Sequence, residues 1–401
     1  MLPLDDVRVL DLTQMVAGPY CTIFLADQGA EVIKIEPPKT GEAGRRLDPL
    51  LGPPGNQVSG FFLRLNRNKK SLPIDLRQPD GKEIFRDLVK VSDVVVENFR
   101  PGVMNRLGLG YEALRKLNPR IIYASISGFG HDDIFQSPYS DRPAFAIVAE
   151  AMGGVMDLAG EEDGPPVWGG YGLGDLQAGS MAAQGILVAL YARARTREGQ
   201  HVDVSMVDSI ASLNERTIAT YGMTGEVLTR GKERFVCPFG VYKAKDGYVV
   251  IAVVGELIWK RFCRAIGRDD WAEDERLNSG GKRADCVHEV LNPAISAWIG
   301  ARTRAEAVEH LTEHEVPAAP VYNGKDLFDD PHLRSREMIV ELEHPVAGKI
   351  AVAGSPIKLS AFPHIPRVAP AELGQHTDEI LGGLLAYSDE RIADLRGRGV
   401  V

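Results

Sequence analysis

The 401-residue sequence is poor in cysteine and carries no excess of basic residues. Its four cysteines, at positions 21, 237, 263 and 286, show no paired spacing, so we expect neither a disulfide framework nor a cysteine-based zinc site. The formal net charge is −9, and an acidic protein lacks the broad positive field that nucleic-acid binding requires. A nucleic-acid partner is therefore not expected, although local basic clusters can still bind small anions.

The sequence also has no long hydrophobic run. No segment approaches the roughly 18 uninterrupted apolar residues that a membrane-spanning helix needs. The N-terminal segment, MLPLDDVRVLDL, has acidic residues where a signal peptide has positive charge. Together with the unpaired cysteines, these features predict a cytoplasmic protein without a membrane partner.

Several short catalytic signatures are absent or misplaced. The first turn after a predicted strand has only Ala17–Pro19, with too few glycines for the pyrophosphate of a nicotinamide cofactor. A Gly-x-Gly-x-x-Ala match at 108–113 follows a helix-like segment instead of a strand, so it lacks the context of a dinucleotide site. The Gly-x-Ser-x-Gly nucleophile elbow of a serine hydrolase is absent from the sequence. His310–His314 matches a zinc-peptidase pattern, but the short helix supplies no third ligand, so no metal site is expected.

Strands alternate with helices over the first 130 residues. VRVLDL (7–12) and EVIKIE (31–36) are predicted strands that flank a helical stretch, CTIFLADQGA (21–30). Such a unit implies parallel strands, and VVVENF (94–99) and IIYASISGFG (121–130) continue the pattern. The fold class is therefore predicted to be α/β with an open, doubly wound sheet.

The chain is longer than one hydrophobic core usually organises, so we expect more than one domain. The predicted boundaries are a large α/β domain at 1–200, a linker helix at 201–225, a small α+β domain at 226–330, and a linker with the C-terminal part of the large domain at 331–401. The small domain is predicted to begin with a hairpin, FGVYKAKDGYVVIAV.

One carboxylate stands out, that of Asp175, at the end of the glycine-rich segment WGGYGLGD. An aspartate at the start of a long helix is often only an N-cap, which is the simpler interpretation. Four nearby glycines cost conformational entropy that a cap does not require. Small residues around a carboxylate let a bulky substrate and backbone N–H donors approach it, so Asp175 is the candidate catalytic residue.

Basic, polar and aromatic residues follow other predicted strands, at 68–71, 74–77 and 98–106. Open α/β sheets bind ligands at the ends of their strands, where arginine and lysine suit phosphates and Phe99 suits an adenine ring. For each segment taken alone, a solvated loop is the alternative interpretation.

Taken together, these motifs resemble the class III coenzyme A-transferases, the CaiB/BaiF family. The similarity spans essentially the whole chain and includes VLDLTQMVAGPYCTIFLADQGAEVIKIEPP, LNRNKKSLPIDLR, DVVVENFRPGVMNRLGLG, LGDLQAGSMAAQGILVAL, EGQHVDVSMVDS and GQHTDEIL. The resemblance implies a Rossmann-like large domain built from both chain ends, an inserted small domain, and an interlocked homodimer.

The resemblance also implies the site residues, with Asp175 as the catalytic aspartate and coenzyme A and acyl-CoA as substrates. It implies no permanently bound cofactor and no metal. Matching the family's coenzyme A contacts one position at a time gives Val16, Ala17, Ile74, Asp75, Leu76, Arg77, Asn98, Phe99, Arg100, Arg106, Ser127, Gly128, Phe129 and Gly130. Val16, Pro37 and Ser127 differ in type from the residues of formyl-CoA transferases, so formyl-CoA/oxalate specificity is not expected.

The family's reaction moves coenzyme A from an acyl-CoA to a free carboxylic acid. Asp175 would attack the thioester to form a mixed anhydride, and the released thiolate would convert that anhydride into an aspartyl-CoA thioester. Tyr139, Arg142, Tyr171, Phe235 and Phe239 are candidates for the acyl pocket, with Arg142 as a partner for the second carboxylate of a diacid.

Three alternatives remain open on the sequence. A 2-methylacyl-CoA racemase shares the fold but pairs the aspartate with a histidine, whose place is taken here by Phe145, with His131 as a nearby substitute. An intramolecular coenzyme A-transferase would have the same sequence features. A non-catalytic CoA-binding protein would have no need for the carboxylate of Asp175.

Overall fold

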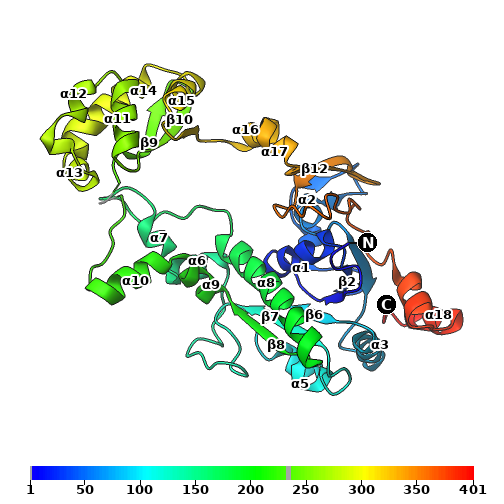
Figure 1. Ribbon diagram of the computed structural model, residues 1–401. Helices are drawn as coiled ribbons and strands as arrows, with labels where there is room; N and C mark the ends of the chain where they lie inside the picture. Colours follow the sequence, from blue (N-terminus) through cyan, green and yellow to red (C-terminus); the bar gives the residue numbers. More distant parts are fainter. Residues whose placement is uncertain (1, 232–235) are drawn as a thin grey trace. The chain divides into compact units, whose positions relative to one another are not determined.

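The computed structural model describes residues 2–231 and 236–401 and divides the chain into two compact units (Figure 1). The large unit consists of Met1–Gly160, Pro165–Leu228 and Ser335–Val401. The small unit consists of Glu161–Gly164 and Thr229–Arg334.

A six-stranded parallel sheet forms the centre of the large unit. Its strands, in their order across the sheet, are β5 (Lys69–Pro73), β2 (Glu31–Glu36), β1 (Arg8–Asp11), β6 (Val94–Glu97), β7 (Ile122–Ser127) and β8 (His201–Ser205). The predicted α/β class with a parallel sheet is confirmed. The strand order reverses between β1 and β6, and in open α/β sheets ligands usually bind at the carboxyl ends of the strands at such a reversal.

Helices cover both faces of this sheet, as expected for buried strands whose side chains alternate between two cores. Val9 and Val32 face one core with α1 (Ala17–Asp27), α6 (Ala146–Met152), α8 (Leu173–Thr196) and α9 (Met206–Leu213). Leu10 and Ile33 face the other core with α3 (Pro79–Lys90), α4 (Val103–Leu107), α5 (Tyr111–Leu114) and α18 (Asp389–Gly397). Each fully buried leucine or isoleucine stabilises the fold by about 1.5–3 kcal/mol.

Short elements complete the large unit. They are β3 (Leu50–Leu51), β4 (Val58–Ser59), α2 (Gly60–Leu63), α7 (Val155–Leu158), α10 (Glu215–Thr224), the hairpin strands β12 (Ile339–His344) and β13 (Gly348–Ala353), and a π-helical turn at Glu379–Leu384. The C-terminal segment returns to the edge strand β5, where the Ser71 N–H donates to His376 Nδ1 at 3.2 Å. The Asp75 N–H likewise donates to the Val400 carbonyl oxygen at 2.8 Å.

The small unit packs helices on a three-stranded sheet with its own core. Its elements include β9 (Phe239–Ala244), β10 (Gly247–Ala252), β11 (Ala318–Pro320), α11 (Glu256–Ala265), α12 (Asp269–Ala272), α13 (Gly280–Asp285), α14 (Asn292–Gly300), α15 (Arg304–Glu313) and α16 (Gly324–Asp329), with α17 (Pro331–Ser335) at its end. β9 and β10 pair antiparallel, so the predicted hairpin is present.

The zinc-peptidase match lies in this small unit, and both of its histidines have structural partners. His310 Nε2 donates to the Ala265 carbonyl oxygen at 2.8 Å, and His314 Nδ1 donates to the His310 carbonyl oxygen at 2.9 Å. Among the described residues, no group of histidine, cysteine, aspartate or glutamate side chains could hold a metal ion. In the same part of the chain, none of the helices combines the length and apolar character needed to cross a membrane.

Candidate active site

The segments predicted to contact coenzyme A lie at the carboxyl ends of the strands of the large sheet. Parallel strands have their carboxyl ends on the same side of the sheet, and the segments follow β1, β5, β6 and β7 there. Val16 and Ala17 begin α1 after β1, residues 74–77 follow β5, residues 98–100 follow β6, and residues 127–130 end β7 and continue beyond it. Arg106 lies in α4, which follows the β6 loop.

The two loops at the strand-order reversal are tied together by Asn98. Its side-chain oxygen accepts from the Gln14 N–H at 2.9 Å, and its amide donates to the Gln14 carbonyl oxygen at 2.9 Å. Met15, which follows Gln14, has a left-handed backbone with φ of 65°. Its N–H donates to the buried Glu42 carboxylate at 3.2 Å. The loops after β1 and β6 are therefore tied to each other and to Glu42 by hydrogen bonds.

A buried charge cluster lies at the end of β1. The Asp11 carboxylate accepts from Thr13, from Thr22 and, at 3.1 Å, from the Lys69 ammonium, and the Lys34 ammonium is 3.8 Å away. Burial raises the pKa of Asp11, but the two lysines and the hydroxyl donors outweigh burial and lower that pKa to about 2.

The basic segment at 68–71 was predicted to follow a strand, and the structure places it elsewhere. Lys69 and Lys70 lie within β5 instead of after a strand, and Lys69 is buried against Asp11. Lys70 pairs with Glu31 and Glu379. Lys69 is therefore engaged inside the protein, Lys70 forms ion pairs at the surface, and both belong to a strand instead of a loop.

Asp175 is the third residue of α8, not its N-cap. The N-cap is Gly172, whose φ of 69° favours glycine and which has no side chain with which to cap the helix. The N-cap interpretation of Asp175 is therefore wrong. Asp175 is half-buried, and no described residue donates a hydrogen bond to its carboxylate or forms an ion pair with it.

Two glycines bring α8 into close contact with its neighbours. A Cβ atom on Gly174 would lie 2.7 Å from the Ala146 carbonyl oxygen, so only glycine fits beside the start of α6. A Cβ atom on Gly179 would lie 2.5 Å from the Ala17 carbonyl oxygen. The helix that carries Asp175 therefore packs directly on the first turn of α1, beside a predicted coenzyme A contact.

Two charged groups act on Asp175, and neither was singled out from the sequence. Burial and the Glu150 carboxylate raise the pKa of Asp175 to about 6, while the Arg64 guanidinium acts in the opposite direction. Glu150 comes from α6 and is 3% exposed, and its Oε1 accepts from the Gly174 N–H at 3.2 Å. Arg64 follows α2, with its Cζ 4.5 Å from the centre of the Phe61 ring. A carboxylate with this pKa is mainly ionised at neutral pH and is more basic than an ordinary aspartate.

His131, the histidine considered as a substitute base for a racemase, is engaged by two carboxylates. His131 Nδ1 lies 2.8 Å from an Asp203 oxygen, and its Nε2 faces Glu97 at 3.9 Å. Burial lowers the pKa of His131, but its Asp203 and Glu97 partners outweigh burial and raise that pKa. Phe145, at the position of the racemase histidine, is 74% exposed and carries no acid–base group. The two-base proton exchange of a racemase therefore has no second base among these residues.

The candidate acyl-pocket residues fall into different parts of the molecule. The Arg142 guanidinium lies 4.0 Å from the centre of the Tyr139 ring, which packs edge-on against Phe129. Tyr171 is exposed just before α8. Phe235 lies outside the described residues, and Phe239 belongs to the small unit.

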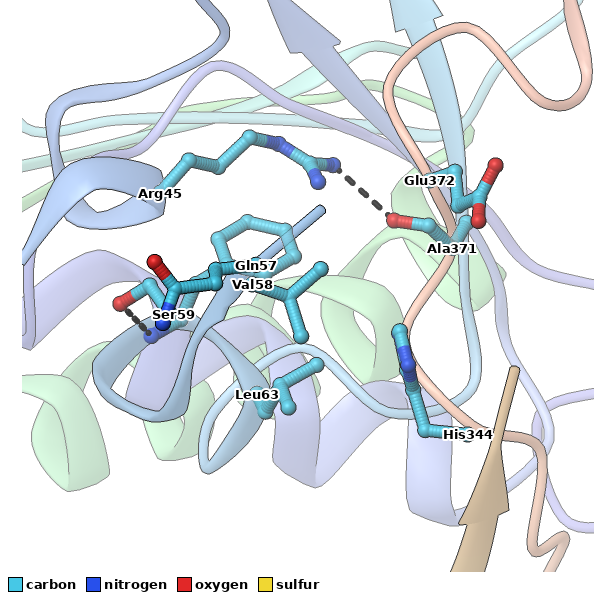
Figure 2. Close-up of a pocket in the computed structure, with 9 residues that line it drawn as sticks. Arg45, Gln57, Val58, Ser59, Leu63, His344, Ala371 and Glu372 are labelled. Atoms are coloured by element: carbon cyan, nitrogen blue, oxygen red, sulfur yellow. Dashed lines mark hydrogen bonds between the residues drawn. The ribbon is translucent and has the colours of Figure 1, made fainter. Parts of the chain in front are cut away.

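A separate cavity of about 140 Å³ lies beside α2 and includes no predicted coenzyme A contact (Figure 2). Its lining includes Arg45, Phe62 and His344. Arg45 donates to the Ala371 carbonyl oxygen at 3.1 Å, and its guanidinium lies 3.8 Å from the centre of the Phe62 ring. Small-molecule sites usually measure about 300–1,000 Å³, so this cavity is too small for coenzyme A.

Comparison with known proteins gives a consistent result over nearly the full length. The model of CoA-transferase family III matches residues 4–377. The chain is 43% identical to the succinyl-CoA:mesaconate CoA-transferase of Haloarcula hispanica, over 94% of this chain and 95% of that one. It is 38% identical to the succinyl-CoA–D-citramalate CoA-transferase of Chloroflexus aurantiacus, over 100% of this chain and 98% of that one.

A solved structure agrees with these relatives. A CaiB/BaiF family protein from Brucella suis superposes with a TM-score of 0.83 at 31% identity, over 96% of this chain and 99% of that one. The resemblance inferred from the sequence motifs is confirmed. The chain is an enzyme that belongs to CoA-transferase family III.

Proposed function

We propose that this enzyme moves coenzyme A from succinyl-CoA, or a similar acyl-CoA, to a free dicarboxylic acid, with Asp175 as the nucleophile. The observation that carries the proposal is the carboxylate of Asp175, which has no hydrogen-bond partner among the described residues and lies on a helix that packs against Ala17, just after β1. The names of two relatives, which pair succinyl-CoA with mesaconate or D-citramalate, support the substrate class.

Coenzyme A is proposed to lie along the loops that follow β1, β5, β6 and β7. Arg77, Arg100 and Arg106 would interact with its phosphates, since guanidinium groups form strong charge-assisted hydrogen bonds with phosphate oxygens. Phe99 would flank the adenine. The reaction calls for no permanently bound cofactor and no metal.

The reaction begins when an Asp175 oxygen attacks the thioester carbonyl of the donor. The C–S bond breaks, coenzyme A leaves as the thiolate, and a mixed anhydride forms. The thiolate then attacks the aspartyl carbonyl, which releases the first acid and leaves an aspartyl-CoA thioester. The acceptor carboxylate repeats these steps in reverse and restores free Asp175. N–H groups near the glycine-rich turn would stabilise the tetrahedral oxyanions.

Incubation with succinyl-CoA and a panel of acids, followed by mass spectrometry of the acyl-CoA products, tests this proposal. Wild-type protein should form new acyl-CoA with dicarboxylic acceptors. Asp175→Ala should reduce the rate by more than about 1,000-fold, as expected for loss of a covalent nucleophile, and should still bind coenzyme A. Undiminished turnover by Asp175→Ala would refute the assignment, and deuterium uptake at the α-carbon of a 2-methylacyl-CoA without transfer would favour the racemase.

We also propose that the enzyme is a homodimer in a reducing cytoplasm. The helix α10 exposes Ile218, Tyr221 and Met223, the last with 84% of its surface accessible. Such a row of exposed apolar side chains is typical of an interface. Buried free thiols at Cys21, Cys237 and Cys263 fit a reducing compartment. Light scattering after size-exclusion chromatography should give twice the mass of one chain.

A further inference from the structure

Glu150 is a buried carboxylate next to the nucleophile, and the reaction as described leaves it without a role. It lies on α6 and is 3% exposed. Its Oε1 accepts a hydrogen bond from the Gly174 N–H at 3.2 Å, one residue before Asp175 in the first turn of α8. Gly174 is held against the Ala146 carbonyl oxygen in the same helix α6, so α6 fixes this turn at two points.

A simple structural role would be to satisfy a free N–H group at the helix start. The first four N–H groups of any helix lack partners within the helix, and a side-chain oxygen often accepts from one of them. A neutral glutamine or serine would supply the same bond. A buried anion beside Asp175 carries an additional cost, because two neighbouring carboxylates repel each other. The negative charge of Glu150 therefore calls for an explanation beyond helix capping.

We propose that Glu150 is a positioning residue for Asp175, fixing the first turn of α8 and placing a second carboxylate beside the nucleophile. This inference rests on the proposed function. The first effect holds Gly174, so that the Asp175 side chain projects from a rigid turn. It also occupies an N–H group, which leaves the Asp175 oxygens free of that donor and available to attack.

The second effect concerns charge along the reaction path. Free Asp175 is an anion, whereas its anhydride and thioester are neutral at that carbonyl. A nearby negative charge therefore disfavours the free carboxylate relative to the covalent intermediates. The raised pKa of Asp175, to which burial and Glu150 both contribute, is consistent with this electrostatic pressure.

Few other charges act on Asp175. α1, β7, β8 and α9 also pack against α8, but Glu150 and Arg64 are the described groups whose charges affect it. Arg64 opposes Glu150, so a change at Glu150 leaves the cation dominant. Removal of the negative charge should therefore lower the pKa of Asp175 and make it a weaker nucleophile.

The test compares Glu150→Gln, which keeps an acceptor oxygen for the Gly174 N–H, with Glu150→Ala, which loses it. Glu150→Gln should reduce kcat by about 10-fold with little change in KM, and should move the acid limb of the pH profile of kcat/KM to lower pH. Glu150→Ala should lose more activity, and Glu150→Asp should restore the wild-type pH profile in part. Glu83→Gln, an exposed α3 residue paired with Arg391, is the control for the change in net charge.

A second measurement keeps this inference separate from the proposed function. Labelling of the Asp175 carboxyl by a carbodiimide and an amine, followed by peptide mass spectrometry across pH, reports its protonation without any turnover. The labelling midpoint should fall in Glu150→Gln. An unchanged midpoint and an unchanged kcat would show that Glu150 is only a helix cap. Failure of the wild type to transfer coenzyme A would refute the proposed function but leave the labelling result interpretable.

Discussion

Asp11 and Asp175 are aspartates of the same unit, both near the carboxyl edge of the sheet, yet their surroundings differ. Asp11 is completely buried, with two lysines and two hydroxyl groups around it, and its pKa is lowered to about 2. Asp175 is only half-buried, and among the described residues its carboxylate has no hydrogen-bond partner. Its pKa is raised to about 6 by burial and by Glu150.

The difference separates a charge that stabilises the fold from a charge available for chemistry. A buried carboxylate surrounded by cations and donors is held in one state, and its oxygens are already engaged. A partly buried carboxylate beside another anion is less stable as an anion, and its oxygens remain free. Removal of each aspartate should therefore have opposite effects on stability.

The largest expected effect on stability comes from Asp11→Ala. It would leave Lys34 and Lys69 buried beside each other without their anion, at a cost of about 3–5 kcal/mol in the free energy of unfolding. Urea unfolding followed by hydrogen exchange of peptides from the large unit measures this change. The control is Glu112→Ala, which breaks an exposed pair with Arg115 and should change stability by less than about 1 kcal/mol. Equal midpoints for Asp11→Ala and wild type would contradict a structural role for the cluster.

An intermediate effect is expected at Arg64, the cation that acts to lower the pKa of Asp175. Among the described residues its guanidinium has no hydrogen-bonding partner, and we expect it to bind the second carboxylate of a diacid. Arg64→Ala should lower kcat/KM for succinate by about 30- to 100-fold, equivalent to about 2–3 kcal/mol, with little change for butyrate.

Arg142→Ala is the matched comparison, since Arg142 was the candidate from the sequence and stacks on Tyr139 instead. A selective loss for diacids in Arg142→Ala alone would assign the recognition to Arg142. Equal losses for succinate and butyrate in Arg64→Ala would mean that Arg64 stabilises the reacting oxygens and not the distant carboxylate.

The smallest effect on stability is expected for Asp175→Asn, and its sign is opposite to that of Asp11→Ala. The folded chain binds the Asp175 proton more tightly than the unfolded chain, so stability is lost as pH rises through about 6. Asparagine removes this cost. At pH 7 the variant should be more stable than wild type by about 1 kcal/mol, a value reduced for partial exposure, and the difference should vanish below about pH 4. A variant less stable than wild type at pH 7 would show that Asp175 has a stabilising partner.

The strands β1, β2, β6 and β7 were predictable from the sequence because apolar strands and amphipathic helices alternate there with regular spacing, whereas β5 and β8 were not predicted as strands. The start of α8 was also predictable, since a glycine-rich segment precedes a long apolar run, and the role of Asp175 as nucleophile stays a prediction. The local error was its position in that helix, because Gly172 with a left-handed backbone serves as the N-cap. Propensity rules rank aspartate above glycine at a cap, but the positive φ of the turn decides this case.

The partners of Asp175 were not predictable, since they depend on packing between distant segments. Glu150 had a weak signal, being the one charged residue in the apolar helix AIVAEAM. Arg64 had none, because nothing in the sequence brings the end of α2 near α8. Lys69 was misplaced for the same reason, since its role depends on the pairing of β5 with β2 and on the nearby Asp11.

The return of the C-terminal segment to β5 has a consequence for biosynthesis. A ribosome completes the entire small unit before it reaches His376 and Val400, which supply bonds to Ser71 and Asp75. The small unit can therefore assemble on the emerging chain while the edge of β5 still lacks its covering segment. Until that segment arrives, the nascent chain presents an open strand edge of the kind that promotes aggregation, and the large unit closes only after residues 376–400 have been made.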